Sequence, residues 1–549
     1  MRHHQEKKMR WFETRGPVNP QDNYVVPRTD ELADFIQKVK KGRYIVLFAP
    51  RQTGKTTFFR AALDALEAET FDWFPIQLNF EEYKNVAPDA FYGYLSNDIR
   101  AEIQQVFQRR KQGQPSEALK HFLANLRLTE HVSMRMFFEE LGRFLPDRRV
   151  VLIIDEFDGI PPATVSDFLH SLRRIYLSPH NRCIHSVGIV GVKNIAQLNY
   201  DRSVSPFNVQ DEFHLPNFTF KQVQELLAQY TEEAGQAFAP EVVADLHRQT
   251  DGQPVLVNRL AQILTEELDI PKDETLGREH FLTAHAQVLG EPNVNIQHLT
   301  THIRSNPNFQ RVLMRITSYD AGLDFNIDDE VISELATYGI IKKGSSISNR
   351  DKCEITNPIY LYRILKTLKP TINGLEEEYY PHATDNAHRT SPIEYINPAG
   401  HIDMAGLLDN FRDFIARAGY RILQVPDTPQ EFVGQHLLFA YLDQFVQQVN
   451  AVMHLEVQTG RGRIDLMVSH RGQKHIVETK MWQGEKSCQA GKEQLAKYLK
   501  LEGTPVGYYV VFDYRQTPKP QVKTEQVAGM TIRSYVIPVV QEQPSAVTL

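Results

Sequence analysis

The sequence predicts an α/β protein in which a parallel sheet is followed by a helical region and then by a separate second α/β domain. Two observations predict this fold class. In the first part of the chain, short apolar runs of β-favouring residues alternate with stretches of helical periodicity, which is typical of a mostly parallel sheet with helices on both faces. Further along, residues 370–400 are rich in proline, glycine, asparagine and charge, and a new alternation begins after them.

The length of 549 residues exceeds the size at which one hydrophobic core keeps growing, so we expect several packed units. After residue 215 the strands give way to helical patterns, and a hairpin candidate around Gly344 among further helices fits a small winged-helix unit. The expected divisions are an amino-terminal extension (1–27), an α/β core (28–215), a helical lid (216–300), the winged-helix-like unit (301–369), a linker (370–400) and the second α/β domain (401–549).

Composition and charge narrow the functional classes. Hydrophobic content of 42% is ordinary for a soluble globular protein, and no apolar run approaches the roughly 20 residues of a membrane-spanning helix, so we expect no membrane role. The charged amino end lacks the apolar stretch of a secretory signal, which favours the cytosol. The three cysteines lie far apart, which argues against disulfides and structural zinc. The net charge of -7 gives no global attraction to nucleic acid, although a local basic face could still bind it.

The strongest motif follows the first predicted strand, Tyr44–Phe48, and precedes a helical stretch. The octapeptide Ala49-Pro-Arg-Gln-Thr-Gly-Lys-Thr56 fits the phosphate-binding P-loop pattern, with alanine in place of the first glycine. Backbone N–H groups of such a loop point at phosphate oxygens, its lysine reaches the terminal phosphates, and its last hydroxyl can ligate magnesium. We therefore expect ATP and Mg²⁺ here, held by Ala49, Pro50, Arg51, Gln52, Thr53, Gly54, Lys55, Thr56 and Thr57.

A pair of acidic residues supports this site. The apolar run Val150–Ile154 ends in Asp155 and Glu156, so a buried strand delivers two carboxylates at its carboxyl end, where ligands of open α/β sheets bind. We expect Asp155 to be the magnesium partner and Glu156 to orient and deprotonate the attacking water. Without the upstream loop, the acidic pair would indicate only a solvated strand end.

Together these motifs resemble those of bacterial AAA-like ATPases close to the STAND group, over about residues 28–368. The resemblance implies an ATPase that acts as a switch or assembly motor for an attached effector domain and that can form homo-oligomers. It leaves an arginine finger unassigned among Arg173, Arg174 and Arg202. The segments that carry the resemblance are Ala49–Thr57, Ile153–Glu156, Ser186–Gly191, Ser205–Asn208, Leu215–Thr219, Thr250–Val257 and Asn357–Tyr360.

The second α/β domain contains a predicted three-stranded meander that unites three polar side chains. Alternation along its second strand leaves Asp465 on the face opposite the apolar residues. In the third strand Glu478 and Lys480 share a face while Thr479 points away, so a hairpin can bring Asp465 to this pair. The predicted strands are Met453–Gln458, Arg463–Val468 and His475–Trp482.

The chemistry of this group points to a metal site. Two close carboxylates repel each other unless a cation joins them, and their hard oxygen atoms suit Mg²⁺ or Mn²⁺. There the metal would polarise a scissile phosphate, while Lys480 would orient water or stabilise developing negative charge.

The spacing of Asp465 and Glu478-Thr-Lys480 resembles the PD-(D/E)XK nuclease core, over about residues 401–538, although Ile464 stands where that motif has proline. The resemblance implies that Glu431 is the acid of the first helix and a further metal ligand. It also implies that a helix follows the core, and the residues of this chain that match it are Gln494 and Tyr498.

Other interpretations stay open. The acids and Lys480 could form only a cross-strand surface pair, and Lys486, Lys497 and Lys500 could be a phosphate-binding rim or the solvated face of a helix. The leading hypothesis is an ATPase that controls a magnesium-dependent nuclease acting on DNA, in defence or mobile-element biology. The alternatives are an ATP-dependent switch whose carboxyl-terminal domain binds nucleic acid or protein without cleaving it, and the same chemistry on RNA.

Overall fold

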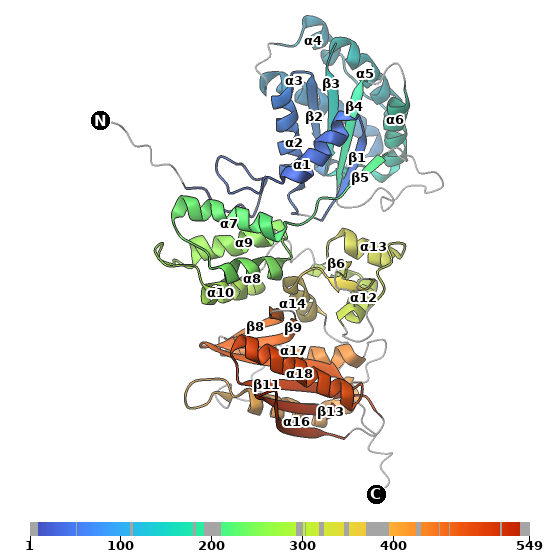
Figure 1. Cartoon of the computed structure of the whole chain (residues 1–549). Helices are drawn as coiled ribbons and strands as arrows, with labels where there is room; N and C mark the ends of the chain where they lie inside the picture. Colours follow the sequence, from blue (N-terminus) through green and yellow to red (C-terminus); the bar gives the residue numbers. More distant parts are fainter. Residues whose placement is uncertain are drawn as a thin grey trace, which may run out of the picture. The chain divides into compact units, whose positions relative to one another are not determined.

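Figure 1 shows the computed structural model of the whole chain. The chain divides into two compact units, and each is described by itself. The first contains Met1–Ala237, Gly252–Gln262 and Thr337–Gly339, and the second contains the remainder of the chain. Side chains at 48, 417–423, 430–432, 456–459 and 462–464 are not described. The structure describes residues 9–50, 52–109, 114–178, 183–191, 210–291, 300–301, 303–317, 323–344, 351–368, 395–423, 430–449, 451–459, 462–515 and 519–538.

A five-stranded parallel sheet forms the centre of the first unit. Its strands follow the order β2-β3-β4-β1-β5, so β4 separates the strand before the phosphate loop from the strand that ends at Asp155. This result confirms the α/β fold with a parallel sheet that the sequence predicts. The strands are β1 (Tyr44–Phe48), β2 (Trp73–Asn79), β3 (Arg149–Asp155), β4 (Ile184–Gly191) and β5 (Gln210–Phe213).

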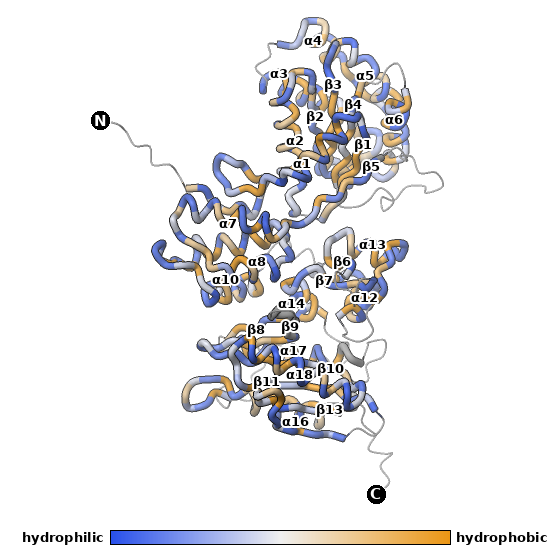
Figure 2. The backbone as a smooth tube through the Cα atoms, viewed as in Figure 1, coloured by the Kyte–Doolittle hydropathy of each residue, from blue (hydrophilic) through white to orange (hydrophobic). Residues whose placement is uncertain are grey.

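Helices cover both faces of this sheet, and successive strand residues alternate between two cores. Leu152 belongs to a core with α3 to α6, whereas its neighbour Ile153 belongs to a core with α1 and α2. The strands are drawn as largely hydrophobic in Figure 2, as expected when both faces are covered. The helices of this unit are α1 (Thr29–Lys40), α2 (Lys55–Glu69), α3 (Pro88–Arg109), α4 (Glu117–Ala124), α5 (His131–Phe144), α6 (Val165–Leu177), α7 (Phe220–Ala234) and α9 (Pro254–Gln262).

The second unit begins with helices and a small antiparallel sheet. Strands β6 (Ile341–Lys343) and β7 (Cys353–Ile355) pair with each other, and they flank the hairpin that the sequence predicts. The tip of that hairpin, 345–350, lies outside the described residues. The helices here are α8 (Pro240–Thr250), a π-helical turn (Ile263–Glu267), α10 (Arg278–Gly290), α12 (Pro307–Thr317), α13 (Glu330–Thr337) and α14 (Pro358–Thr367).

A six-stranded mixed sheet completes the second unit, in the order β12-β13-β11-β10-β9-β8. Strands β10, β11 and β13 are parallel to one another, and the other pairings are antiparallel. The predicted meander corresponds to β8 to β10, and three further strands extend the sheet. The elements are α16 (Met404–Leu423), α17 (Gln430–Gln448), β8 (Val452–Thr459), β9 (Gly462–His470), β10 (Gln473–Met481), α18 (Glu485–Glu502), β11 (Val506–Asp513), β12 (Gln521–Val527) and β13 (Met530–Pro538).

Helix α18 defines one face of this second sheet. Its residues Leu495 and Leu499 share a core with Met467 of β9, Ile476 of β10 and Tyr509 of β11. Because strand residues alternate, Asp465, Glu478 and Val511 lie on the same face. Each is two positions from one of the strand residues in that core. Helix α16 lies on the other face, where the Tyr535 hydroxyl donates to the Ala405 carbonyl at 3.2 Å.

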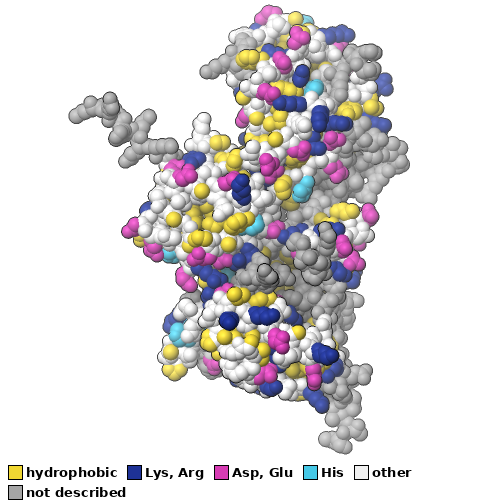
Figure 3. Space-filling view, viewed as in Figure 1, with side chains coloured by type: hydrophobic (Ala, Val, Ile, Leu, Met, Phe, Trp, Pro, Cys, Tyr) yellow, Lys and Arg dark blue, Asp and Glu magenta, His cyan; other side chains and the backbone are white. Residues whose placement is uncertain are grey.

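The described surface carries charges of both signs. On the face drawn in Figure 3, lysine and arginine side chains are interspersed with acidic ones, which agrees with the small net charge of -7. Within the described residues, no helix combines the length and the apolar character that crossing a membrane requires.

Candidate functional site

The phosphate loop joins β1 to the first residue of α2, as the motif predicts. Gly54 has φ +84° and Gln52 has φ +60°, so the loop turns through the left-handed region at two of the three positions before Lys55. Glycine adopts that region without the steric cost that a side chain brings. The first turn of α2 therefore begins directly after the loop, and the free backbone N–H groups and the positive end of the helix dipole lie at this end of the helix. Arg51 lies outside the described residues.

Lys55 is buried and its ammonium group lies against the loop itself. Its Nζ donates to the carbonyl oxygens of Ala49 at 2.8 Å and Pro50 at 2.9 Å. The hydroxyl of Thr53 donates to the Pro50 carbonyl at 2.9 Å and closes the turn. The loop is therefore held in shape by its own side chains.

A hydroxyl and a carboxylate meet beside the loop. The Thr56 hydroxyl donates to Oδ2 of Asp155 at 3.0 Å, although the residues are 99 positions apart in sequence and β4 separates β1, which precedes the loop, from β3, which ends at Asp155. Burial raises the pKa of Asp155, while the Thr56 hydroxyl and the backbone N–H of Glu156 oppose that rise. A hydroxyl and a carboxylate in contact are hard oxygen donors of the kind that Mg²⁺ prefers, so these two residues fit a magnesium ion beside the loop.

Glu156 follows with a left-handed backbone, at φ +50° and ψ +44°, and is half-buried. This conformation is uncommon for a residue other than glycine, and such residues cluster at functional sites. The arginine-finger candidates Arg173 and Arg174 lie on α6, and Arg202 lies outside the described residues.

Sequence reasoning missed Arg28, which connects the loop to the segment before α7. Its side chain is buried and donates to the carbonyl oxygens of Pro216 at 2.7 Å and Thr53 at 3.3 Å. The guanidinium also lies 4.7 Å from the centre of the Phe218 ring, and burial lowers its pKa to about 10. A single arginine far from the motif gives no sequence signal of such a role.

The second candidate site lies where β9 and β10 part. Their antiparallel ladder ends at the pair Leu466 and Val477, so Asp465 and Glu478 are the next residues on the two strands. Both carboxylates are buried. Lys480 bridges them, because its Nζ lies 3.0 Å from Oε1 of Glu478 and 3.6 Å from Oδ2 of Asp465. The structure thus brings together the three residues that the strand pattern places on one face.

Thr479 differs from the prediction that it points away. Its backbone N–H and its hydroxyl both donate to Oδ2 of Asp465, at 2.9 Å and 3.3 Å. The ladder of β10 with β9 ends two residues earlier, at Val477, so no described residue of β9 pairs with Thr479 and the Asp465 carboxylate accepts from it instead. Thr479 therefore orients the carboxylate that the sequence assigns to the metal.

The pKa values of Glu478 and Lys480 are shifted because the two acids and the lysine are buried close together. Burial and the neighbouring carboxylate of Asp465 raise the pKa of Glu478 to about 8, although Lys480 opposes the rise. The two acids raise the pKa of Lys480 against the effect of burial, so its ammonium stays charged. Two buried carboxylates with one nearby cation form an oxygen donor set that fits Mg²⁺ or Mn²⁺.

The remaining predicted residues of this site are less centrally placed. Tyr498 is buried in the core beneath α18 and accepts a hydrogen bond from exposed Gln494 of the same helix. Glu431 lies near the start of α17, but its side chain is not described. Among the described side chains, no three histidine, cysteine or acidic residues converge as a metal site, so Asp465 and Glu478 stand there as a pair.

Comparison with known families identifies the larger part of the chain. The model of a family described as an AAA-like domain matches residues 14–360, which is more than half of the sequence. The chain belongs to the AAA-like domain family. Residues 403–516 match a second family, described only as a domain of unknown function, and Asp465, Glu478 and Lys480 lie within it. None of the curated proteins compared with the chain matches it.

Several solved structures are similar to the AAA-like chain. A Walker-type ATPase of Pyrococcus abyssi is 14% identical with a TM-score of 0.43, covering 64% of this chain and 99% of that one. The Orc1 protein of Aeropyrum pernix, solved in complex with DNA, is 17% identical with a TM-score of 0.32, covering 64% and 94%. The RuvB Holliday junction branch migration motor of Thermotoga maritima is 14% identical with a TM-score of 0.31, covering 63% and 95%.

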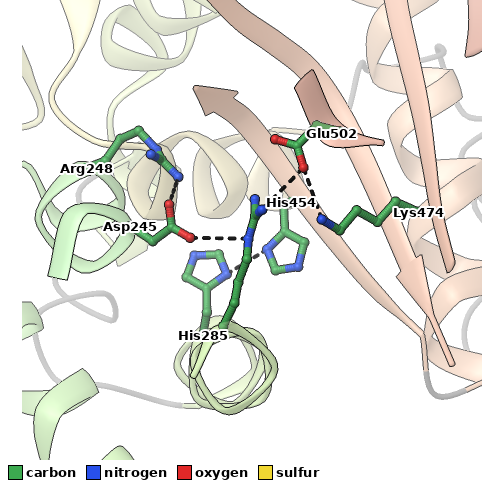
Figure 4. Close-up of polar contacts among 7 residues, drawn as sticks. Asp245, Arg248, His285, His454, Lys474 and Glu502 are labelled. Atoms are coloured by element: carbon green, nitrogen blue, oxygen red, sulfur yellow. Dashed lines mark hydrogen bonds and ion pairs between the residues drawn. The ribbon is translucent and has the colours of Figure 1, made fainter. Parts of the chain in front are cut away.

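Within the second unit, helix α10 of the AAA-like segment contacts the carboxyl-terminal domain through a charged residue, and α8 contributes an acid to the same group of charges (Figure 4). Arg278 of α10 lies between two acids. Its Nη1 is 3.3 Å from Oε2 of Glu502, the last residue of α18. Its Nε is 3.5 Å from Oδ2 of Asp245, on α8. Lys474 of β10 also binds Glu502, at 3.1 Å. Arg248 pairs with Asp245 from within α8.

A pair of fully buried histidines lies beside these charges. Nδ1 of His285, on α10, is 3.0 Å from Nδ1 of His454, on β8. One Nδ1 must donate and the other must accept, so at least the accepting imidazole is neutral. Burial lowers the pKa of His285 to about 3 and that of His454 well below its usual value. The AAA-like segment thus contacts β8, which pairs with β9 of the second candidate site, and the end of α18.

Proposed function

We propose that ATP binding and hydrolysis by the AAA-like domain control a divalent-metal-dependent nuclease centre in the carboxyl-terminal domain, with DNA as the substrate. The single observation that carries the proposal is the buried acid pair of Asp465 and Glu478, bridged by Lys480 at 3.0 Å and 3.6 Å. An acid pair with a lysine beside it combines ligands for a metal with a cation for developing negative charge.

At the nucleotide site, Lys55 would meet the terminal phosphates of ATP, and Thr56 and Asp155 would hold Mg²⁺. Their contact of 3.0 Å supports this assignment. Bound Mg²⁺ would neutralise charge on the phosphates. Glu156 follows Asp155 directly and would orient the attacking water and accept its proton.

At the nuclease site, Asp465 and Glu478 would hold the metal, and Thr479 would fix the carboxylate of Asp465 through its two hydrogen bonds. The metal would polarise the scissile phosphodiester and acidify a bound water. Lys480 would stabilise negative charge that develops on the phosphate oxygens.

The contacts of Arg278, Glu502 and Lys474 support a coupling between the two activities. Glu502 ends α18, and Lys474 lies on β10, the strand of Glu478 and Lys480. A displacement of α10 would therefore act on two elements that position the nuclease centre. We also propose that the AAA-like domain assembles as a homo-oligomer.

The decisive experiment incubates the full chain with linear, circular and single-stranded DNA and with RNA, with and without ATP and Mg²⁺ or Mn²⁺. Lys480→Ala is expected to abolish cleavage while ATP hydrolysis persists, and Lys55→Ala to abolish ATP binding. Lys492→Ala serves as the matched control, because it removes another acid-paired lysine from the same domain.

Cleavage that survives Lys480→Ala would reject the nuclease centre. A chain that cleaves no nucleic acid but changes its oligomeric state with ATP would be a switch with a binding domain instead. Cleavage confined to RNA would keep the chemistry and change the substrate.

A further inference from the structure

A fully buried carboxylate holds a half-exposed guanidinium at the carboxyl end of β11. Asp513 has 0% of its surface exposed, whereas the side chain of Arg515 is 44% exposed. Nε of Arg515 donates to both carboxylate oxygens, at 2.9 Å and 3.1 Å, and Nη2 donates to Oδ2 at 2.6 Å. The guanidinium also lies 4.1 Å from the ring centre of Trp482, in cation–π contact.

The strand register places the end of β11, which leads to this arginine, beside the end of the strand that carries Glu478 and Lys480. Parallel strands β10 and β11 set Lys480 opposite Val511, and the N–H of Trp482 donates to the Phe512 carbonyl at 2.9 Å. Asp513 therefore follows Val511 by two residues and lies on the same face of the sheet. Two residues along a strand span about 7 Å, so Trp482 continues the line of Glu478 and Lys480 along β10, and the Arg515 guanidinium lies against its ring.

We propose that Arg515 binds the phosphodiester backbone of the nucleic acid beside the bond that is cleaved, with Asp513 and Trp482 as its positioning residues. This inference rests on the proposed nuclease function. Along one nucleic-acid strand, successive phosphates advance about 3.4 Å per nucleotide, so a contact beside Trp482, two residues along the chain from Lys480, falls within a few nucleotides of the acid pair.

The geometry favours ligand binding over a purely structural ion pair. The carboxylate engages the edge of the guanidinium formed by Nε and Nη2, and within the described residues Nη1 makes no hydrogen bond. A planar guanidinium clamped on one edge and stacked on an indole loses little further freedom when its other edge binds a phosphate. Arginine also matches phosphate geometry through paired N–H donors.

A second arginine of the same sheet provides the matched control. Arg533 pairs with Asp409, lies near the Tyr535 ring at 5.6 Å and has a side chain that is 30% exposed. Its neighbours Ile532 and Val536 belong to the core beneath α18, so Arg533 faces α16 on the opposite side of the sheet. Each of the two arginines forms an ion pair and a cation–π contact of its own. They differ in the face of the sheet on which they lie, because Asp465 and Glu478 are on the face of Arg515 and not on that of Arg533.

The test measures binding of a fluorescein-labelled DNA duplex of about 20 base pairs to the full chain in Mg²⁺ and ATP, in a Lys480→Ala background that prevents cleavage. Arg515→Ala is expected to weaken binding about tenfold and to reduce the salt dependence by about one counterion, while Arg533→Ala changes neither. With cleavage intact, Arg515→Ala should raise KM and leave kcat within about threefold.

Arg515→Lys keeps the ion pair with Asp513 and guards against misfolding, and it should bind with intermediate affinity because lysine lacks the planar fork. Binding that Arg515→Ala and Arg533→Ala weaken equally would overturn the subsite even if Lys480 proves essential for cleavage. Arg515-dependent binding without any cleavage by the wild type would reject the nuclease and keep the subsite. Comparing the DNA duplex with an RNA duplex of equal length shows which nucleic acid supplies the phosphodiester backbone. Failure to bind either duplex overturns the inference.

Discussion

At the scale of single residues, Glu478 shows how the proposed metal site strains the fold that carries it. Burial and Asp465 raise the pKa of its carboxyl to about 8 from 4.5 in the unfolded chain. The folded state then binds a proton that the unfolded state releases, so this group destabilises the metal-free protein as pH rises from about 4.5 to about 8. A bound cation would relieve the same repulsion.

Replacing Glu478 by glutamine removes this titration and tests its sign. Relative to wild type, metal-free Glu478→Gln should gain stability between pH 5 and pH 8, on the order of 1 kcal/mol per pH unit in the middle of that range. Urea unfolding at the two pH values measures the difference, with Glu485→Gln as an exposed control on α18. A difference that is independent of pH would show that Glu478 ionises normally.

At the scale of elements, the contact between α10 and β8 depends on two neutral imidazoles. His285 and His454 are fully buried, and Arg248, Arg278 and Lys474 add positive charge around them. Their pKa values are depressed in the folded state, so their contribution to stability is present above about 6.5 and is lost as pH falls. The sign is opposite to that of Glu478.

Acidification should therefore weaken this contact. Between pH 6.5 and pH 5, each histidine is expected to cost the wild type up to about 2 kcal/mol of unfolding free energy. The double variant His285→Leu/His454→Leu removes both partners together, which avoids leaving one ring unpaired, and should lose much less on acidification. Equal acid sensitivity of the two proteins in urea unfolding would contradict the assignment of neutral rings.

At the scale of the whole molecule, the proposal requires that nucleotide state reach the nuclease centre through the second unit. Arg278 is the residue of the AAA-like segment that binds Glu502 at the end of α18. If this contact transmits the effect of ATP, then removing it should separate the two activities without abolishing either. Coupling free energies between sites commonly correspond to factors of about 5 to 150.

Arg278→Ala should leave ATP hydrolysis unchanged and reduce the effect of ATP on cleavage at least about fivefold. Cleavage assays with and without ATP measure this ratio. Arg248→Ala is the matched control, because Arg248 pairs with Asp245 on its own helix and forms no ion pair with the carboxyl-terminal domain in the described residues. An ATP effect that Arg278→Ala leaves intact would place the coupling elsewhere.

The sequence by itself determined the features that arise from contiguous residues. The phosphate loop is one strand, one turn and one helix start, and Asp465 and Glu478 are joined by a single hairpin whose alternation places them on one face. Local periodicity and turn chemistry encode both arrangements. The parallel sheet followed from the alternation of strands and helices for the same reason.

Only the tertiary structure decided which distant segments meet. The contact of Thr56 with Asp155 depends on the strand order. The contact of Arg515 with Trp482 depends on the parallel pairing of β10 and β11, which α18 connects. His285 and His454 meet although they are 169 positions apart in sequence. Burial of apolar surface drives such long-range pairings, and it leaves no period in the sequence from which partner or register can be read.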